Sequence, residues 1–116
     1  MNLKLIMAMV ADEKTQAILD AARKAGATGA TVITSVRGEG LKPEKTFLGL
    51  EVTGQCDVLL FLVAEPKARQ ILETIADAGQ LDDDPGAGIA FQVAIEDAVG
   101  LRSQEQTILK EIEATV

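Results

Sequence analysis

The feature that most constrains the fold is an internal repeat with a constant offset. When the sequence is aligned with itself at an offset of 53 residues, the end of a strand, the helix that follows and the glycine that ends the helix match a second copy of the same pattern. The offset is the same for all the matched segments. A true repeat explains this better than chance matching in a chain rich in Ala and Leu. Two strand–helix–strand units in tandem predict an α+β, ferredoxin-like βαββαβ sandwich. The matched segments are Val10-Ala11-Asp12 with Val63-Ala64-Glu65, Ile18-Leu19-Asp20 with Ile71-Leu72-Glu73, and Ala25-Gly26 with Ala78-Gly79.

In the first unit, residues 3–10 form an apolar run of strand length. Asp12 is expected to cap the helix that follows, and Gly26 is expected to end it in the left-handed conformation. A second strand spans residues 31–36. The side chains expected inside this strand are those of Val32, Ile33 and Val36.

In the second unit, residues 50–63 are expected to form one long strand. Pro66 fits the first turn of a helix that ends at Gly79. The last strand is predicted from apolar residues that alternate with small or polar ones, which is typical of a half-buried strand; they are Ile89, Phe91, Val93 and Ile95. These elements make residues 1–102 one domain. The tail, residues 103–116, is compatible with a short helix because Ser103 and Gln106 have the spacing of a capping box.

The third predicted strand is apolar on both faces, with Leu59 and Phe61 on one and Val58, Leu60 and Leu62 on the other. Two helices can cover only one face of the sheet. Soluble monomers avoid large exposed apolar patches. The sequence therefore predicts a homo-oligomer that buries the second face.

A long loop, residues 36–50, separates the two units and carries Arg37, Lys42 and Lys45. A loop of this length in a compact domain is uncommon and is usually functional. Gly38 and Gly40 allow the backbone to turn sharply and its amides to approach a ligand. An ordinary long hairpin with solvated basic side chains remains the alternative.

Composition excludes several functions. A net charge of −7 argues against non-specific nucleic-acid binding, and 3% aromatic residues leave almost nothing to stack on bases. The chain has no His, so histidine-based triads and ordinary zinc sites are excluded, and no general acid–base pair is visible. We therefore expect no enzyme, no catalytic residues and no metal ligands. Cys56 is expected to be a small hydrophobe in a strand.

The apolar run at the start of the chain is too short to insert into a membrane. A cytoplasmic location is the simplest expectation.

Four segments in this order resemble the PII signal-transduction family: Gly-Ala-Thr-Val at 29–32, Arg-Gly-Glu-Gly at 37–40, Pro-Gly-Ala-Gly at 85–88, and residues 95–102. Together the resemblance covers about residues 3–102. It implies a homotrimer with an adenine nucleotide in each cleft between subunits, and no covalent cofactor. It also implies that the long loop changes shape with the ligand and docks on a regulated target, such as a membrane transporter.

The resemblance also assigns residues to this site. Base and sugar would contact Met9, Thr31, Gly38, Gly40 and Val63, whereas the phosphates would contact Gly86, Ala87, Gly88 and Arg102, with Arg37 at the base of the loop. The partner would contact Glu39, Leu41, Lys42, Lys45 and Phe47 of the loop.

Three departures from the family pattern remove positive charge. The family's phosphate lysine is Ile89 here, one of two closing arginines is Gly100, and the lysine after the long loop corresponds to Asp57. A charge-assisted hydrogen bond contributes about 1.5–3 kcal/mol, so we expect ADP or AMP to bind better than ATP. Mg²⁺ could bridge a nucleotide to the acidic residues 82–84, although a plain acidic turn is the favoured interpretation.

These changes resemble divergent PII-like proteins, some of them linked to nitrogen or inorganic-carbon regulation. With no Tyr in the chain, regulation by tyrosine modification is excluded. Two alternatives remain: a trimeric interaction module without nucleotide binding, which the three departures would suit, and a small ferredoxin-like enzyme, which ranks last.

Overall fold

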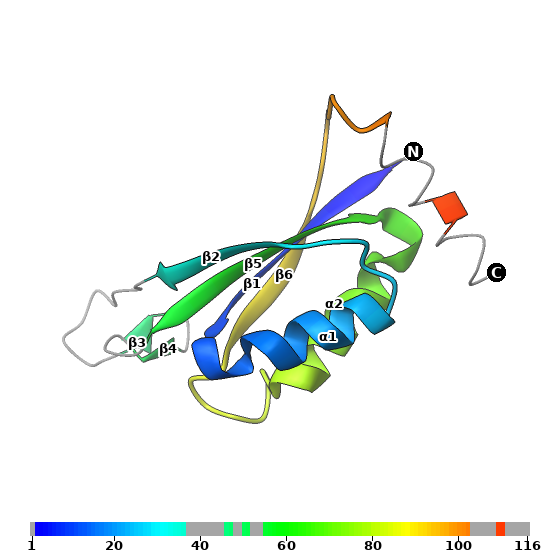
Figure 1. Ribbon diagram of the computed structural model, residues 1–116. Coiled ribbons are helices and arrows are strands. Elements are labelled where there is room, and N and C mark those ends of the chain that lie inside the picture. Colours follow the sequence, from blue (N-terminus) through cyan, green and yellow to red (C-terminus); the bar gives the residue numbers. More distant parts are fainter. Residues whose placement is uncertain (1, 37–45, 48–49, 52–54, 103–108, 111–116) are drawn as a thin grey trace.

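The computed structural model describes residues 2–36, 46–47, 50–51, 55–102 and 109–110 (Figure 1). Its main sheet has the strand order β2-β5-β1-β6, and all neighbouring strands are antiparallel. Two helices pack on one side of this sheet, which gives two layers (Figure 1). The predicted ferredoxin-like fold is confirmed. The elements are β1 (Leu3–Ala11), η1 (Asp12–Lys14), α1 (Thr15–Lys24), β2 (Thr31–Val36), β3 (Thr46–Phe47), β4 (Leu50–Glu51), β5 (Cys56–Ala64), α2 (Glu65–Gly79) and β6 (Gly88–Ala94).

The single strand expected over residues 50–63 is wrong, because the structure divides it into two strands. β4 pairs with β3 in a separate two-stranded hairpin, and only β5 belongs to the main sheet. β2 is irregular as well: its register against β5 shifts between Ile33 and Val36, where Ser35 has a φ of 58°. The regular pairing of β2 with β5 is thus interrupted near the end of β2.

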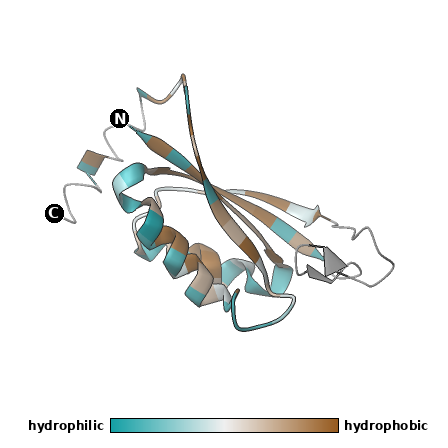
Figure 2. Ribbon diagram, turned by 180° about the vertical axis from the view of Figure 1, so that it is seen from behind, coloured by the Kyte–Doolittle hydropathy of each residue, from teal (hydrophilic) through white to brown (hydrophobic). Residues whose placement is uncertain are grey.

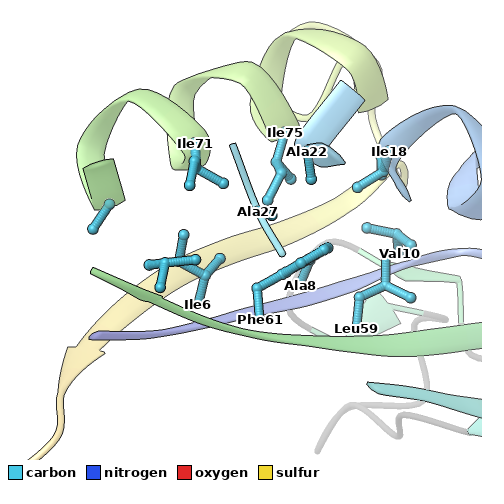
Figure 3. Close-up of a cluster of buried hydrophobic side chains, with 12 residues drawn as sticks. Ile6, Ala8, Val10, Ile18, Ala22, Ala27, Leu59, Phe61, Ile71 and Ile75 are labelled. Atoms are coloured by element: carbon cyan, nitrogen blue, oxygen red, sulfur yellow. The ribbon is translucent and has the colours of Figure 1, made fainter. Parts of the chain in front are cut away.

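The core lies between the helices and one face of the sheet (Figure 3). Side chains alternate along β1, so that Ile6, Ala8 and Val10 point to the helices. Phe61 of β5 is the largest fully buried side chain. The other buried members are Ile18, Ala22, Ala27, Leu59, Val63, Ala68, Ile71 and Ile75.

The predicted end of α1 at Gly26 is confirmed. Gly26 has a φ of 114°, its N–H donates to the Arg23 carbonyl at 3.1 Å, and the Ala27 N–H donates to the Ala22 carbonyl at 2.9 Å. These two bonds form the Schellman motif. The expected cap at Asp12 is wrong, because Asp12 lies inside η1 and no side chain caps that element.

Pro66 lies in the first turn of α2, as predicted, and α2 ends at Gly79. The left-handed residue is Gln80, however, with a φ of 55°. A Cβ on Gly79 would lie 2.9 Å from Cδ1 of Ile18. Gly79 therefore allows α2 to approach α1 closely.

Neither α1 nor α2 covers the other face of the sheet (Figure 2), and we call this face the open face. Residues that pair directly across antiparallel strands share a face. The register therefore forms three apolar rows: Leu62–Leu5–Val93, Leu60–Met7–Phe91, and Ile33–Val58–Met9–Ile89. Phe91, Val93 and Ile33 are 37%, 45% and 47% exposed.

One expectation about burial is wrong. Val32 and Ile33 were expected inside, but both are exposed: Ile33 lies on the open face, and Val32, which pairs with Leu59, lies in β2 at the edge of the sheet. The apolar row of β6 faces away from the helices. Its small and polar partners, such as Ala90 and Gln92, face toward them.

Replacing Phe61 with Ala should lower the free energy of unfolding by about 3–5 kcal/mol, because it leaves a cavity in the core. Denaturant unfolding measures this change. Val99→Ala is the control, since Val99 is 96% exposed and its replacement should change stability by less than about 0.5 kcal/mol. Equal effects of the two substitutions would contradict this description of the core.

Candidate functional site

Two of the predicted ligand residues lie on the open face. Met9 lies between Val58 and Ile89 in the sheet, and Thr31, at the start of β2, pairs with Leu60. Met9 is half-buried and Thr31 is exposed. The Thr31 hydroxyl is thus placed at the sheet edge, where a ligand or a second chain can reach it.

The glycine loop, residues 86–88, enters β6 beside the end of β1. Gly86 and Gly88 have φ values of 83° and 143°, which strongly favour glycine. A Cβ on Gly88 would collide with the carbonyl oxygen of Met9 and lie 2.9 Å from the Val10 Cα. Ala87 is buried, and its carbonyl accepts a hydrogen bond from the Ala11 N–H at 3.1 Å. The loop is therefore held tightly against β1.

The acidic turn before the glycine loop is tied to the helix layer. The Lys14 ammonium lies 3.3 Å from Oδ2 of Asp84 and donates to Oε1 of Gln80 at 2.9 Å. The Ala87 N–H donates to the Asp84 carbonyl at 3.0 Å. Asp84 thus helps to fix the glycine loop. Within the described part of the chain, no three acidic or Cys side chains gather as metal ligands would.

Asp57 has a structural contact. It is buried, faces the helices, and its Oδ2 accepts a hydrogen bond of 2.6 Å from the Thr15 hydroxyl. Asp57 therefore ties the start of α1 to β5.

The neighbouring Cys56 is buried. Burial raises the pKa of the Cys56 thiol, and the carboxylates of Asp12 and Asp57 raise it further. A thiol with a raised pKa forms little thiolate near neutral pH, so Cys56 fits the predicted role of a small buried hydrophobe.

Arg102 and Val63 lie at the other end of the sheet from the glycine loop. Val63 pairs with Lys4, whereas Gly88 pairs with Val10. Arg102 lines a groove of about 240 Å³ with Leu3, Ile95, Glu96, Ala98, Gly100 and Leu101. β6 spans about 20 Å between the two ends. Arg102 and the glycine loop are therefore not brought together within one protomer.

The predicted loop contacts cannot be placed. Arg37, Gly38, Glu39, Gly40, Leu41, Lys42 and Lys45 lie outside the described residues, and Phe47 is described only as part of the β3 backbone. Of the assigned residues, the structure places Met9, Thr31, Val63, Gly86, Ala87, Gly88 and Arg102.

Sequence reasoning gave no role to Lys67, which is only 6% exposed. It lines a small cavity that also includes Val63. A lysine in the first turn of a helix usually faces solvent. Nothing in the sequence pattern therefore distinguished it.

Comparison with known proteins assigns the family. The family model for nitrogen regulatory protein P-II matches residues 3–105, and the chain therefore belongs to this family. A search of curated proteins gave no match.

Among solved structures, the fold matches a protein from Thermus thermophilus described as a PII-like signalling protein, with a TM-score of 0.60 and 23% identity. The match covers 81% of this chain and 87% of the other. At this identity the likeness shows the fold alone.

Proteins of the P-II family are generally trimeric, non-enzymatic regulators that respond to adenine nucleotides. In the described part of this chain, no helix is long and apolar enough to cross a membrane.

Gly88→Ala should destabilise the protein by several kcal/mol, because the substitution combines an unfavourable φ with a backbone collision. Urea unfolding measures the loss. Gly29→Ala is the matched control, since a Cβ at Gly29 meets nothing within 4 Å. If both variants unfold at the same urea concentration, the glycine loop is not packed against β1 as described.

Proposed function

We propose that this protein is a PII-like signalling protein that binds an adenine nucleotide between the subunits of a homotrimer and regulates a partner through the loop of residues 36–50. The observation that carries the proposal is the separation of the assigned ligand residues. Those that match the family's phosphate side lie at two ends of the sheet, with the glycine loop at one and Arg102 at the other. A cleft between two chains can combine them.

The open face supports assembly. Its three apolar rows run across the sheet, and Phe91, Val93 and Ile33 remain substantially exposed in the single chain. Burying apolar surface contributes about 25 cal/mol per Å². Packing this face against other copies removes that surface from water without any change in the helices, which already cover the opposite face (Figure 2).

The glycine loop is suited to hold an anionic ligand. Gly86 and Gly88 leave room for backbone N–H groups to approach phosphate oxygens. The Lys14–Asp84 ion pair and the hydrogen bond from the Ala11 N–H to the Ala87 carbonyl hold the loop in place before a ligand binds. Arg102 is exposed and carries a guanidinium that can form a forked bond with phosphate.

The contacts of the described residues support a preference for ADP or AMP over ATP. Ile89 lies on the open face beside Met9 and brings no charge to the loop. Asp57 is held by Thr15, and a Cβ at Gly100 would meet nothing within 4 Å. None of these three positions supplies a cation for a third phosphate. Mg²⁺ carried by the nucleotide can offset part of this loss.

The loop of residues 36–50 is proposed to report occupancy. It follows β2, whose first residue, Thr31, is assigned to the base side of the cleft. A ligand that contacts both strand and loop can change the loop's conformation and thereby its affinity for a regulated protein, such as a transporter of the nitrogen or inorganic-carbon supply. The protein is proposed to act in the cytoplasm.

Sedimentation tests the assembly. The wild-type chain should sediment as a trimer at micromolar concentration, and Phe91→Asp should sediment as a monomer because it places a charge in the middle apolar row of the open face. Val99→Asp adds the same charge at a fully exposed residue and should stay trimeric. A wild-type monomer would contradict the proposed assembly.

Calorimetric titration tests the ligand. ADP or AMP should bind with micromolar affinity, and ATP more weakly. Arg102→Ala should weaken ADP binding by about tenfold or more, since it removes one charge-assisted contact, and should leave sedimentation unchanged. Tight ATP binding would overturn the argument from charge. If no nucleotide binds, the trimeric interaction module becomes the better description.

A further inference from the structure

Lys67 is a buried cation whose position no element of the proposed function explains. It lies in the first turn of α2, and only 6% of it is exposed. Its side chain runs across Gly26: a Cβ built on Gly26 would lie 2.6 Å from the Lys67 Nζ and 3.2 Å from its Cδ. The absence of a side chain at Gly26 thus makes room for the ammonium group.

Among the described residues, no hydrogen bond or ion pair reaches this ammonium group. Three other cations of the helix layer do have acidic partners: Lys14 contacts Asp84, Arg23 contacts Asp20, and Arg69 contacts Glu73. Burying an unpaired charge costs several kcal/mol unless a partner compensates it. An ammonium group without a protein partner, carried by a largely buried side chain, is therefore a place where an external anion can gain a contact.

Lys67 lies at the amino end of α2. This end carries the partial positive charge of the helix and no side chain caps it, although the first turn also contains the acidic residue Glu65. The α1–β2 connection runs beside the first turn of α2 (Figure 1).

Between these segments lies a small cavity of about 10 Å³, lined by Gly26, Thr28, Leu62, Val63, Ala64, Lys67 and Ile71. This volume accommodates one atom of the size of a water oxygen. The Thr28 hydroxyl is the only other side-chain donor among the residues that line it. The cavity thus has room for one oxygen of an oxyanion, whose remaining atoms would lie at the mouth.

We propose that Lys67, Thr28 and the amino end of α2 form a binding site for a small oxyanion, a carboxylate or a phosphate group. The site is built within one protomer, so it needs no second chain, although Val63, which is assigned to the base side of the nucleotide cleft, also lines its cavity. It is also separate from the glycine loop, which lies at the opposite end of the sheet. One oxygen enters the cavity and accepts hydrogen bonds from the Lys67 ammonium and the Thr28 hydroxyl.

A purely structural role for Lys67 is the competing account. Its ammonium lies beside the carboxyl end of α1, where the helix carries partial negative charge, so it could serve only to stabilise that end. The two accounts differ in the effect of added anion, which only a binding site would convert into stability.

The experiment measures thermal unfolding and backbone amide NMR spectra of the nucleotide-free protein in sodium phosphate, sodium acetate and sodium chloride at equal ionic strength. Phosphate or acetate should raise the unfolding temperature above its value in chloride and shift the amides of Gly26 and Thr28 in a saturable way. The stronger of the two salts identifies phosphate or carboxylate as the group bound.

Lys67→Met keeps the length of the side chain and removes the charge; it should weaken the fitted affinity by about tenfold or more. Lys24→Met is the matched control, because Lys24 is exposed in the last turn of α1, and its titration should remain like that of the wild type.

Equal anion effects in the wild type and Lys67→Met would overturn the proposal, as would equal effects of chloride and the oxyanions. Shifts at Gly86 and Gly88 instead of Gly26 and Thr28 would place the anion at the glycine loop and also overturn it. A failure here leaves the nucleotide proposal intact, since the titration uses no nucleotide.

Discussion

The structure depends on an imbalance between its two layers. Four strands present apolar side chains on both faces, but α1 and α2, the long helices of the described residues, cover only one of them. On the covered face, Phe61 and Leu59 are packed beneath α1 and α2 (Figure 3). On the open face, Leu60 and Phe91 have no such cover. The proposed assembly follows from this one-sided packing, because other copies of the chain can cover the open face.

The sequence was sufficient to predict the order of the four main-sheet strands and of both long helices. The repeat at a constant offset placed both helices, and Gly26 and Pro66 marked helix boundaries that the structure confirms. Such signals are local: a glycine stop or an apolar run depends on the chain's own backbone. The same local logic failed at Asp12, where a short 3-10 turn replaces the expected cap.

Burial and site geometry could not be predicted in the same way. Val32 and Ile33 are both apolar and were expected inside, but neighbouring residues of a strand point to opposite faces and β2 is at the edge of the sheet, so both are exposed. Arg102 and Gly88 belong to one family motif set but lie at opposite ends of β6. The burial of Lys67 could not be predicted from the sequence because it depends on Gly26, which belongs to the other repeat unit of the chain.

The central claim is that the nucleotide site is complete only between chains. The most direct measurement is ADP binding to the Phe91→Asp protein at concentrations where sedimentation shows a monomer. A folded monomer that does not bind ADP, beside a wild-type trimer that does, is the result this account predicts. A monomer that binds ADP with the affinity of the wild type would contradict it, because the site would then lie within one protomer.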